Sequence, residues 1–190
     1  MVNKHYVVKI VKFISMLNIV LYQPEISPNT GNIIRTCFAL HAKLHIIKPI
    51  AFELLPKYLK RPAAGHLLSD IEHEIHNSYS DFEQKYGQKN IFYITRYGLK
   101  TYSDTNFKKE WKRGNDLFVM FGRESTGIDK WILKKNIKKC LRIPMYAKNR
   151  SINLANSVCV IGYEIMRQLD FPDLSKFEVQ KSKDYLLKND

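Results

Sequence analysis

The chain has 190 residues and a mass of 22.4 kDa, which fits one domain with short extensions. A hydrophobic content of 45% and a mean hydropathy of -0.32 predict an ordinary buried core and exclude a largely membrane-embedded chain. Lysine and arginine number 31 against 18 acidic residues, and the charge of +13 favours a polyanionic partner, nucleic acid before membrane.

Residues 1–15 are predicted to form an N-terminal appendage. The stretch resembles a short signal peptide, but lysines interrupt its apolar run and no small-residue cleavage site follows. It is also too short to cross a bilayer, and we expect Met16 to be the natural start. Residues 17–171 hold 24 basic and 14 acidic residues, so a surplus of ten positive charges belongs to the predicted body rather than to an end.

The first half of the chain alternates strands with helices. A continuous apolar run at Leu17–Tyr22 predicts a buried parallel strand. Asn29 lies at the opening of a helix whose inner face carries Ile33, Cys37 and Leu40. The other elements predicted here are a strand at 44–47, a helix at 51–60 ended by residues 62–65, a strand at 74–76 and a short helix at 81–86.

The second half continues the alternation. Strands are predicted at 91–95, at Leu117–Phe121 and at 140–143, with helices at 108–111 and around Trp131, the latter capped by Asp129. A last helix follows residue 153, because apolar residues recur there at helical spacing: Leu154, Val158, Ile161, Ile165 and Leu169. This order predicts one α/β domain with a mainly parallel sheet and helices on both of its faces.

Cysteine and histidine usage gives no sign of a metal site or a disulfide. Cys37, Cys140 and Cys159 lie in apolar segments without a Cys-x-x-Cys pair, so we expect buried free thiols in a reducing cytoplasm. No ligand cluster is visible among the six histidines. His73 and His76 are expected to be surface or strand residues with no third histidine nearby, and we expect no metal.

The stretch 143–158 combines a strand end, a polar turn and the start of the last helix. Ser151 or Asn153 can cap that helix, and a well-capped core helix accounts for both residues. Capping does not explain the basic Arg150 beside them. It also does not explain three asparagines gathered at one helix mouth, namely Asn149, Asn153 and Asn156.

Three polar loops are predicted at the carboxyl ends of strands, where ligands bind in open α/β sheets. They are residues 29–35, 122–127 and 143–156. The second loop is not a phosphate loop, because Ile128 and Asp129 stand where Lys-Ser/Thr would be needed. The chain has no Gly-x-Gly-x-x-Gly and no Gly-x-Ser-x-Gly. Singly, each loop also fits an ordinary turn, and Arg35 a solvated helix residue; together they favour a binding site.

The three segments resemble, in order and spacing, the three motifs of the SPOUT class of S-adenosylmethionine-dependent RNA methyltransferases. Within that class, residues 17–26 followed by 29–35 resemble the wobble-position tRNA 2′-O-methyltransferases. The resemblance covers residues 16–172, which defines a single methyltransferase domain followed by a tail at 173–190. It implies an α/β fold with a C-terminal deep trefoil knot, a homodimer, and S-adenosylmethionine bound in the knot.

The resemblance also implies site residues by position. Those expected to line the cofactor pocket are Ile94, Gly122, Ile143, Ser151 and Leu154. Those tied to the methyl acceptor and to catalysis are Arg35, Asn29, Glu124 and Asn153. Arg35 is the family's suspected base, but a guanidinium gives up its proton reluctantly, so it could instead orient the hydroxyl or hold a phosphate.

The implied function is methylation of the ribose 2′-hydroxyl of the wobble nucleotide, cytidine or modified uridine, in cytoplasmic tRNA, with no membrane partner. A near alternative keeps this chemistry and moves the target to another tRNA position or to ribosomal RNA. A second alternative is a basic RNA-binding protein without catalysis. A third, a small-molecule α/β enzyme, leaves the positive charge of the body unexplained.

Overall fold

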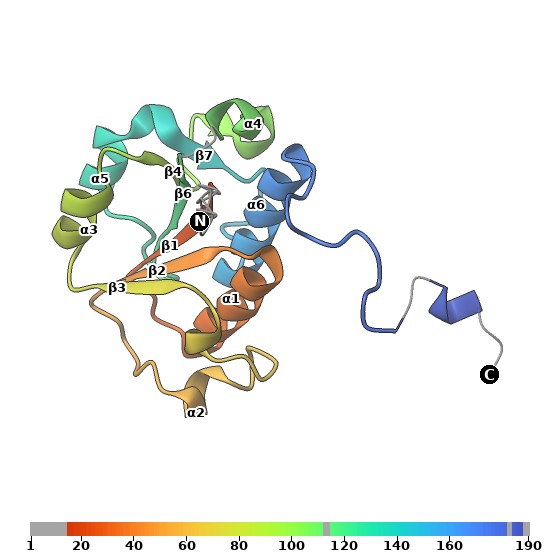
Figure 1. Cartoon of the computed structure of the whole chain (residues 1–190). Helices are drawn as coiled ribbons and strands as arrows, with labels where there is room; N and C mark the ends of the chain where they lie inside the picture. The colour runs from red at the N-terminus through yellow and green to blue at the C-terminus, as the bar shows by residue number, and fades with distance from the viewer. Residues whose placement is uncertain (1–14, 112–114, 182–183, 188–190) are drawn as a thin grey trace, which may run out of the picture.

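The structure, a computed structural model, describes residues 15–111, 115–181 and 184–187 (Figure 1). The predicted appendage 1–15 lies, apart from Ser15, outside the described residues. The described part of the predicted tail leaves the body of the molecule and contains one short 3-10 helix at Tyr185–Leu187 (Figure 1).

A seven-stranded sheet forms the centre of the described chain, in the order β3-β2-β1-β6-β4-β7-β5. Every strand pair in it is parallel. The strands are β1 (Leu17–Tyr22), β2 (Lys43–Ile47), β3 (His73–His76), β4 (Asn90–Ile94), β5 (Lys100–Thr101), β6 (Leu117–Phe121) and β7 (Cys140–Arg142). The mainly parallel sheet predicted from the sequence is therefore confirmed.

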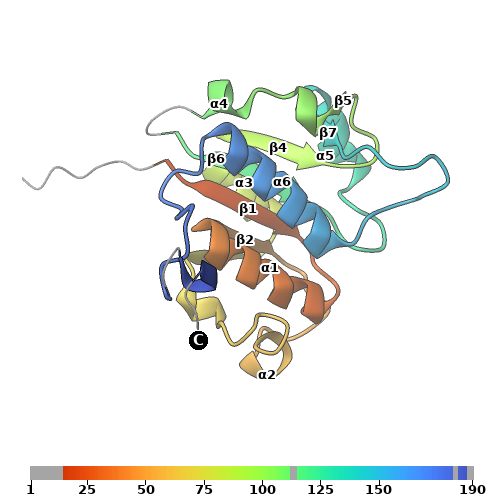
Figure 2. The same cartoon turned by 90° about the vertical axis from the view of Figure 1, so that its right-hand side faces the viewer.

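Helices cover both faces of this sheet, as predicted. Helices α1 (Ser27–Leu40) and α6 (Leu154–Gln168) lie side by side on one face, and α3 (Tyr79–Tyr86) and α5 (Lys130–Lys135) lie on the other (Figures 1 and 2). The remaining α-helices are α2 (Pro56–Leu59) and α4 (Phe107–Glu110). No helix in the described part of the chain has the length and apolar character that crossing a bilayer requires.

The alternation of side chains along β1 divides the core into two layers. Leu17, Ile19 and Leu21 face the layer that holds α1 and α6, whereas Val20 and Tyr22 face the layer that holds α3 and α5. All six residues of β1 are buried, because the strand lies inside the sheet with helices above and below it. Such burial on both faces explains why the strand is apolar apart from Asn18, whose side chain is buried against His45.

Two glycines set how closely α1 is packed. A β-carbon on Gly162 of α6 would lie 2.5 Å from Leu40 Cδ1, so glycine lets α6 approach α1. A β-carbon on Gly31 of α1 would lie 2.4 Å from Pro62 Cγ and 2.7 Å from the carbonyl oxygen of Leu59. The segment after α2 therefore rests directly on the backbone of α1.

Several sequence predictions need correction. Residues 51–55 are not helical; α2 begins only at Pro56, because Leu55 before the proline is extended. The two-residue strand β5 is too short to give a periodic pattern and was not predicted. Cys159 is exposed rather than buried, since it lies on the outer side of α6, while Cys37 and Cys140 are buried as expected.

Candidate active site

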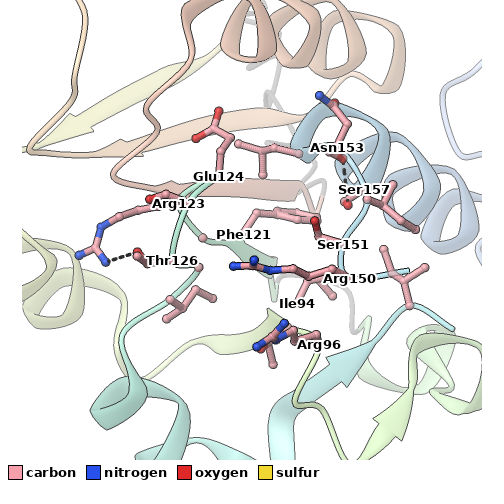
Figure 3. A pocket seen from close by; sticks show the side chains of 18 of the residues that line it. Ile94, Arg96, Phe121, Arg123, Glu124, Thr126, Arg150, Ser151, Asn153 and Ser157 are labelled. Carbon is pink, nitrogen blue, oxygen red and sulfur yellow. Dashed lines mark hydrogen bonds between the residues drawn. The ribbon is translucent and has the colours of Figure 1, made fainter. Parts of the chain in front are cut away.

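Loops that follow β1, β4, β6 and β7 enclose a cavity of about 830 Å³ at the carboxyl edge of the sheet (Figure 3). Eight of the nine residues predicted for the site line this cavity: Asn29, Ile94, Gly122, Glu124, Ile143, Ser151, Asn153 and Leu154. They come from segments as far apart in the sequence as residues 29 and 154. The three polar loops singled out in the sequence therefore meet at one place.

Hydrogen bonds between side chains join the three loops in series. The Asn153 amide donates to Asn29 Oδ1 at 2.9 Å, and the Asn29 amide donates to Glu124 Oε1, also at 2.9 Å. Asn29 is buried, with 6% of its surface exposed, so this middle link is largely shielded from water. We call Asn153, Asn29 and Glu124 the amide relay. Its geometry fixes the orientation of both asparagine amides, because each has a defined donor and acceptor.

Asn153 is also the N-cap of α6. Its Oδ1 accepts hydrogen bonds from the backbone N–H groups of Ala155 at 2.9 Å and Asn156 at 3.3 Å. Of the two capping residues offered by the sequence, Ser151 and Asn153, the structure uses Asn153. One side chain thus satisfies the start of the helix through its oxygen and begins the amide relay through its nitrogen.

Glu124 binds the backbone N–H groups that immediately precede α1. Its carboxylate accepts from the backbone N–H of Glu25 at 2.9 Å and of Ile26 at 3.3 Å, in addition to the Asn29 amide. In the opposite direction, the Glu25 carboxylate accepts from the Ser125 N–H at 2.8 Å and the Ser125 hydroxyl at 2.7 Å. These bonds from Ser125 lower the pKa of Glu25. The two loops therefore clamp each other through reciprocal carboxylate contacts.

Arg123, in the same loop as Glu124, is held in place by polar contacts with residues of two other segments. It donates to Asp129 Oδ1 at 2.8 Å and to Gln23 Oε1 at 2.7 Å, and its guanidinium lies 4.8 Å from the centre of the Tyr22 ring. The Tyr22 hydroxyl donates to Asp129 Oδ2 at 2.5 Å. Bonds from Arg123 lower the pKa of Asp129, and burial together with Asp129 raises the pKa of Tyr22 to about 12.

This arrangement corrects the prediction that the Asp129 side chain caps α5. The residue occupies the N-cap position, but its side chain makes no capping hydrogen bond and pairs with Arg123 and Tyr22 instead. Sequence reasoning also missed Arg123 itself. The available signal was its position, immediately after Gly122 at the end of an apolar strand and six residues before an aspartate.

Apolar side chains and close backbone form the walls of the cavity. Ile94, Ile143 and Leu154 supply apolar surface beside the polar relay. A β-carbon on Gly122 would lie 2.3 Å from the carbonyl carbon of Gly127 and from the Ile128 nitrogen, so only glycine permits the tight return of this loop. The cavity thus offers an apolar wall on one side and amide, hydroxyl and carboxylate groups on the other.

The ninth predicted residue, Arg35, does not line the cavity. It is exposed on α1, less than two turns beyond Asn29. Three other arginines do line the cavity: Arg123, described above, Arg150, whose presence capping left unexplained, and Arg96, which was not predicted from the sequence. Arg96 lies in the loop that follows β4, two residues after Ile94.

Away from the cavity, the structure contradicts the prediction that His76 has no histidine neighbour. The parallel pairing of β2 with β3 brings His45 Nδ1 to 3.0 Å from His76 Nε2, and ligand atoms of His45, Glu74 and His76 lie within 4.8 Å of one another. Hydrogen bonds already engage these groups. His45 Nε2 lies 2.9 Å from Asn18 Oδ1, and Glu74 accepts from Lys43, Lys85 and Tyr86.

Comparison with known proteins identifies one family. The SpoU rRNA Methylase family matches residues 16–163. The tRNA (cytidine(34)-2'-O)-methyltransferase of Escherichia coli (strain K12) is 38% identical over 159 residues, covering 83% of this chain and 96% of the relative. The protein of the same name from Yersinia pestis is 40% identical over 164 residues, with 83% and 96% covered.

Solved structures agree with this result. One described as "Structural insights into the 2-OH methylation of C/U34 on tRNA" is 34% identical, with a TM-score of 0.72, and the match covers 82% of this chain and 97% of that one. The SpoU methyltransferase AviRb from Streptomyces viridochromogenes, in complex with the cofactor AdoMet, is similar in fold alone, at 22% identity and a TM-score of 0.66. That match covers 82% of this chain and 58% of AviRb.

Proposed function

The chain belongs to the SpoU rRNA methylase family, and on that premise we propose that it methylates the ribose 2′-hydroxyl of nucleotide 34, the wobble nucleotide of tRNA. The observation that carries this proposal is its similarity, at 38% identity and over 83% of its length, to a tRNA (cytidine(34)-2'-O)-methyltransferase. The excess of basic residues fits a tRNA substrate. Cytidine or a modified uridine is the expected target nucleotide.

The residues of the cavity fit the cofactor of this family. A volume of about 830 Å³ accommodates a nucleoside that is joined to an amino acid, as S-adenosylmethionine is. We assign Ile94, Ile143 and Leu154 to the apolar contacts of the cofactor, and Gly122 and Ser151 to its polar contacts. S-adenosylmethionine supplies an electrophilic methyl group on a sulfonium and leaves as S-adenosylhomocysteine.

For the amide relay we propose a positioning role at the methyl acceptor. Direct displacement at a methyl carbon requires the attacking oxygen to lie in line with the leaving sulfur, so positioning supplies much of the rate. Asn153, Asn29 and Glu124 hold one another by hydrogen bonds from three separate loops. Because the Glu124 carboxylate already accepts three N–H donors, we assign it to fixing this frame rather than to removing the hydroxyl proton.

Arg35 is proposed to act at the acceptor from the boundary of a homodimer. It lies on the exposed side of α1, which also carries Phe38, 49% exposed. The helix α6 lies beside α1 (Figure 2). On α6, Val160 is 39% exposed and Tyr163 is 44% exposed. Exposed apolar side chains on two adjacent helices are typical of a surface that pairs with another protein. If a second copy of the chain packs on this surface, Arg35 becomes buried in the interface and lies close to the cavity of the partner. Arg35 does not line the cavity of its own chain.

The C-terminal half is proposed to be threaded as a trefoil knot. Strand β7 lies beyond β4 in the sheet, yet α6 returns to pack against α1, so residues 143–153 cross the ends of β4 and β6. The cavity lies where they cross. We further propose that residues 16–172 form the catalytic domain, with 1–15 and 173–190 as extensions, and that the enzyme works in the cytoplasm.

Mapping ribose methylation in tRNA tests the proposed function. We expect tRNA from cells lacking the gene to have lost a single 2′-O-methyl group, at position 34 of one or a few isoacceptors, in mass spectra of nuclease digests. The purified protein with S-adenosylmethionine should restore that group. Loss of a methyl group from ribosomal RNA with position 34 unchanged would instead support the alternative target.

A further inference from the structure

The cavity is lined by three arginines with different surroundings. Arg123 is neutralised, since it pairs with Asp129 at 2.8 Å and also donates to Gln23 and Thr126. Arg96 and Arg150 are exposed, and neither has an acidic partner within the described residues. In Figure 3 the Arg123 guanidinium turns away toward Thr126, whereas Arg96 and Arg150 lie over the cavity itself.

The two loops that carry these arginines, residues 94–99 and 143–153, contain no acidic residue. Among the described residues, the one carboxylate that lines the cavity, that of Glu124, is already occupied by three N–H donors. A guanidinium keeps its charge at all physiological pH values, and its planar fork of donors matches the oxygens of a phosphate. Two such groups at the mouth of one cavity therefore form a site for an anion with more than one charge.

The Arg96 side chain is held in one orientation rather than rotating freely in solvent. Its Nη2 donates to the Tyr97 hydroxyl at 2.6 Å, and its guanidinium lies 4.7 Å from the centre of the Tyr97 ring. Its carbonyl oxygen accepts a hydrogen bond from Arg142 Nη1 on β7. A positioned side chain loses less conformational entropy when it binds a ligand than a freely rotating one.

Exposed aromatic rings accompany the two arginines. Tyr97 directly follows Arg96 and is 61% exposed, and Tyr146 lies four residues before Arg150 and is 73% exposed. Unpaired bases of single-stranded RNA stack on such rings, while arginines hold the backbone. The combination is typical of a surface that binds an RNA loop rather than a small anion.

We infer that Arg96 and Arg150 bind the phosphates on the two sides of the nucleotide that is methylated, with Tyr97 and Tyr146 as stacking surfaces for the neighbouring bases. This inference rests on the proposed function, because it takes RNA as the ligand of the open side of the cavity. It gives Arg150 the role that helix capping did not supply. Arg123, the third arginine, is not available to RNA because it pairs with Asp129.

The test compares cofactor binding with RNA binding in the full-length protein. The variants are Arg96→Ala, Arg150→Ala and, as matched control, Arg167→Ala, an exposed arginine near the other end of α6 that pairs with Glu164 at 2.7 Å. Titration calorimetry measures the affinity of each protein for S-adenosylhomocysteine. Fluorescence anisotropy measures the binding of an anticodon stem-loop RNA over a range of KCl concentrations. Thermal unfolding checks that each variant folds.

We expect Arg96→Ala and Arg150→Ala each to weaken RNA binding about tenfold. Each should also reduce the slope of log Kd against log salt by about 0.7, the value for one phosphate contact on a single strand. Binding of S-adenosylhomocysteine should stay within about twofold of the wild type, since neither arginine is assigned to the cofactor. Arg167→Ala should match the wild type in both assays.

Two outcomes would overturn the inference. If the alanine variants lose S-adenosylhomocysteine binding and keep the RNA salt slope, the arginines hold the carboxylate of the cofactor. If they change neither assay, they are solvated surface residues. A wild-type protein that binds RNA through these arginines but transfers no methyl group would reject the proposed function and leave only the phosphate-binding role of the two arginines standing.

Discussion

At the scale of single residues, Asn153 connects helix stability to the chemistry of the site. Its side-chain oxygen caps α6 and its nitrogen donates to Asn29. We expect Asn153→Ala to lower the free energy of unfolding by about 1 kcal/mol through loss of the cap. It should also reduce kcat by more than tenfold through loss of the amide relay, an effect of roughly 1.4 kcal/mol or more on the barrier. Urea denaturation and methyl-transfer kinetics measure the two effects.

Asn153→Ser separates the cap from the relay. A serine hydroxyl can cap the helix, but it is too short to reach Asn29. Stability should therefore return to near that of the wild type while kcat stays low. If the serine variant recovers both stability and activity, the relay has no role beyond capping.

A second residue-scale prediction concerns pH. Burial lowers the pKa of His45 to about 3, and burial also lowers the pKa of His76. The charged groups facing the pair are Lys43, Glu74, Lys85 and Asp81. Because unfolded histidine titrates near 6.5, the unfolded chain binds more protons than the folded one below that pH, and stability falls as the pH drops from about 6.5 toward 3.

His45→Gln tests this linkage. Glutamine can still donate to Asn18 and accept from His76, but it does not titrate. The wild type should lose up to about 1.4 kcal/mol per pH unit more than the variant between pH 6 and 5, because it takes up one further proton on unfolding. Urea denaturation at several pH values measures the difference, in which other titrating groups cancel. If the free energy of unfolding changes with pH in the same way in the wild type and in His45→Gln, then His45 takes up its proton in the folded protein as readily as in the unfolded chain.

At the scale of elements, the loop after β6 depends on a glycine that allows no side chain. A β-carbon on Gly122 meets backbone atoms of Gly127 and Ile128 at 2.3 Å, and backbone cannot move aside as a side chain can. We expect Gly122→Ala to displace the loop and to weaken S-adenosylhomocysteine binding by more than tenfold, roughly 1.4 kcal/mol, as measured by calorimetry.

Gly31→Ala is the matched comparison for this prediction. Its β-carbon would also collide, with Pro62 and the Leu59 carbonyl oxygen, but away from the cavity. It should lower the melting temperature while the folded protein keeps the Kd of the wild type for S-adenosylhomocysteine. Equal loss of cofactor binding in both variants would mean that Gly122 matters only for folding.

The elements that the sequence predicted well are those with a strong periodic signal. The apolar run of β6 and the helical spacing in α6 were predicted closely, because burial on both faces or on one stripe dictates such patterns. Strand β5 and helix α2 span two and four residues and carry no such signal. The pairing of His45 with His76 depends on the register of β2 and β3, which no local pattern records.

The sequence predicted most of the residues that line the candidate site but not the contacts between them. Eight residues found through motif positions line the cavity, because loops at the carboxyl ends of parallel strands converge. The hydrogen bonds that join Asn153, Asn29 and Glu124 require side-chain directions that spacing does not give. For the same reason the sequence did not reveal that Arg35 lies outside the cavity and that Arg96 lies inside it.

At the scale of the whole molecule, we expect a dimer that forms through α1 and α6. Light scattering should give twice the chain mass of 22.4 kDa. Tyr163→Glu places a charge on the exposed surface of α6 and should yield monomers with reduced activity, because buried charges without partners are costly. Leu99→Glu, at an exposed leucine outside these helices, is the control and should remain dimeric. A Tyr163→Glu protein that is still dimeric would place the interface elsewhere.

Whether the enzyme methylates the ribose of nucleotide 34 can be measured on tRNA that carries or lacks a single oxygen atom, the 2′-hydroxyl oxygen at that position. Substrate tRNA is prepared by ligation with either ribose or 2′-deoxyribose at position 34, and transfer from labelled S-adenosylmethionine is followed. We expect labelling of the ribose form and none of the 2′-deoxy form. Equal labelling of both would contradict this expectation, since the acceptor would then lie elsewhere in the RNA.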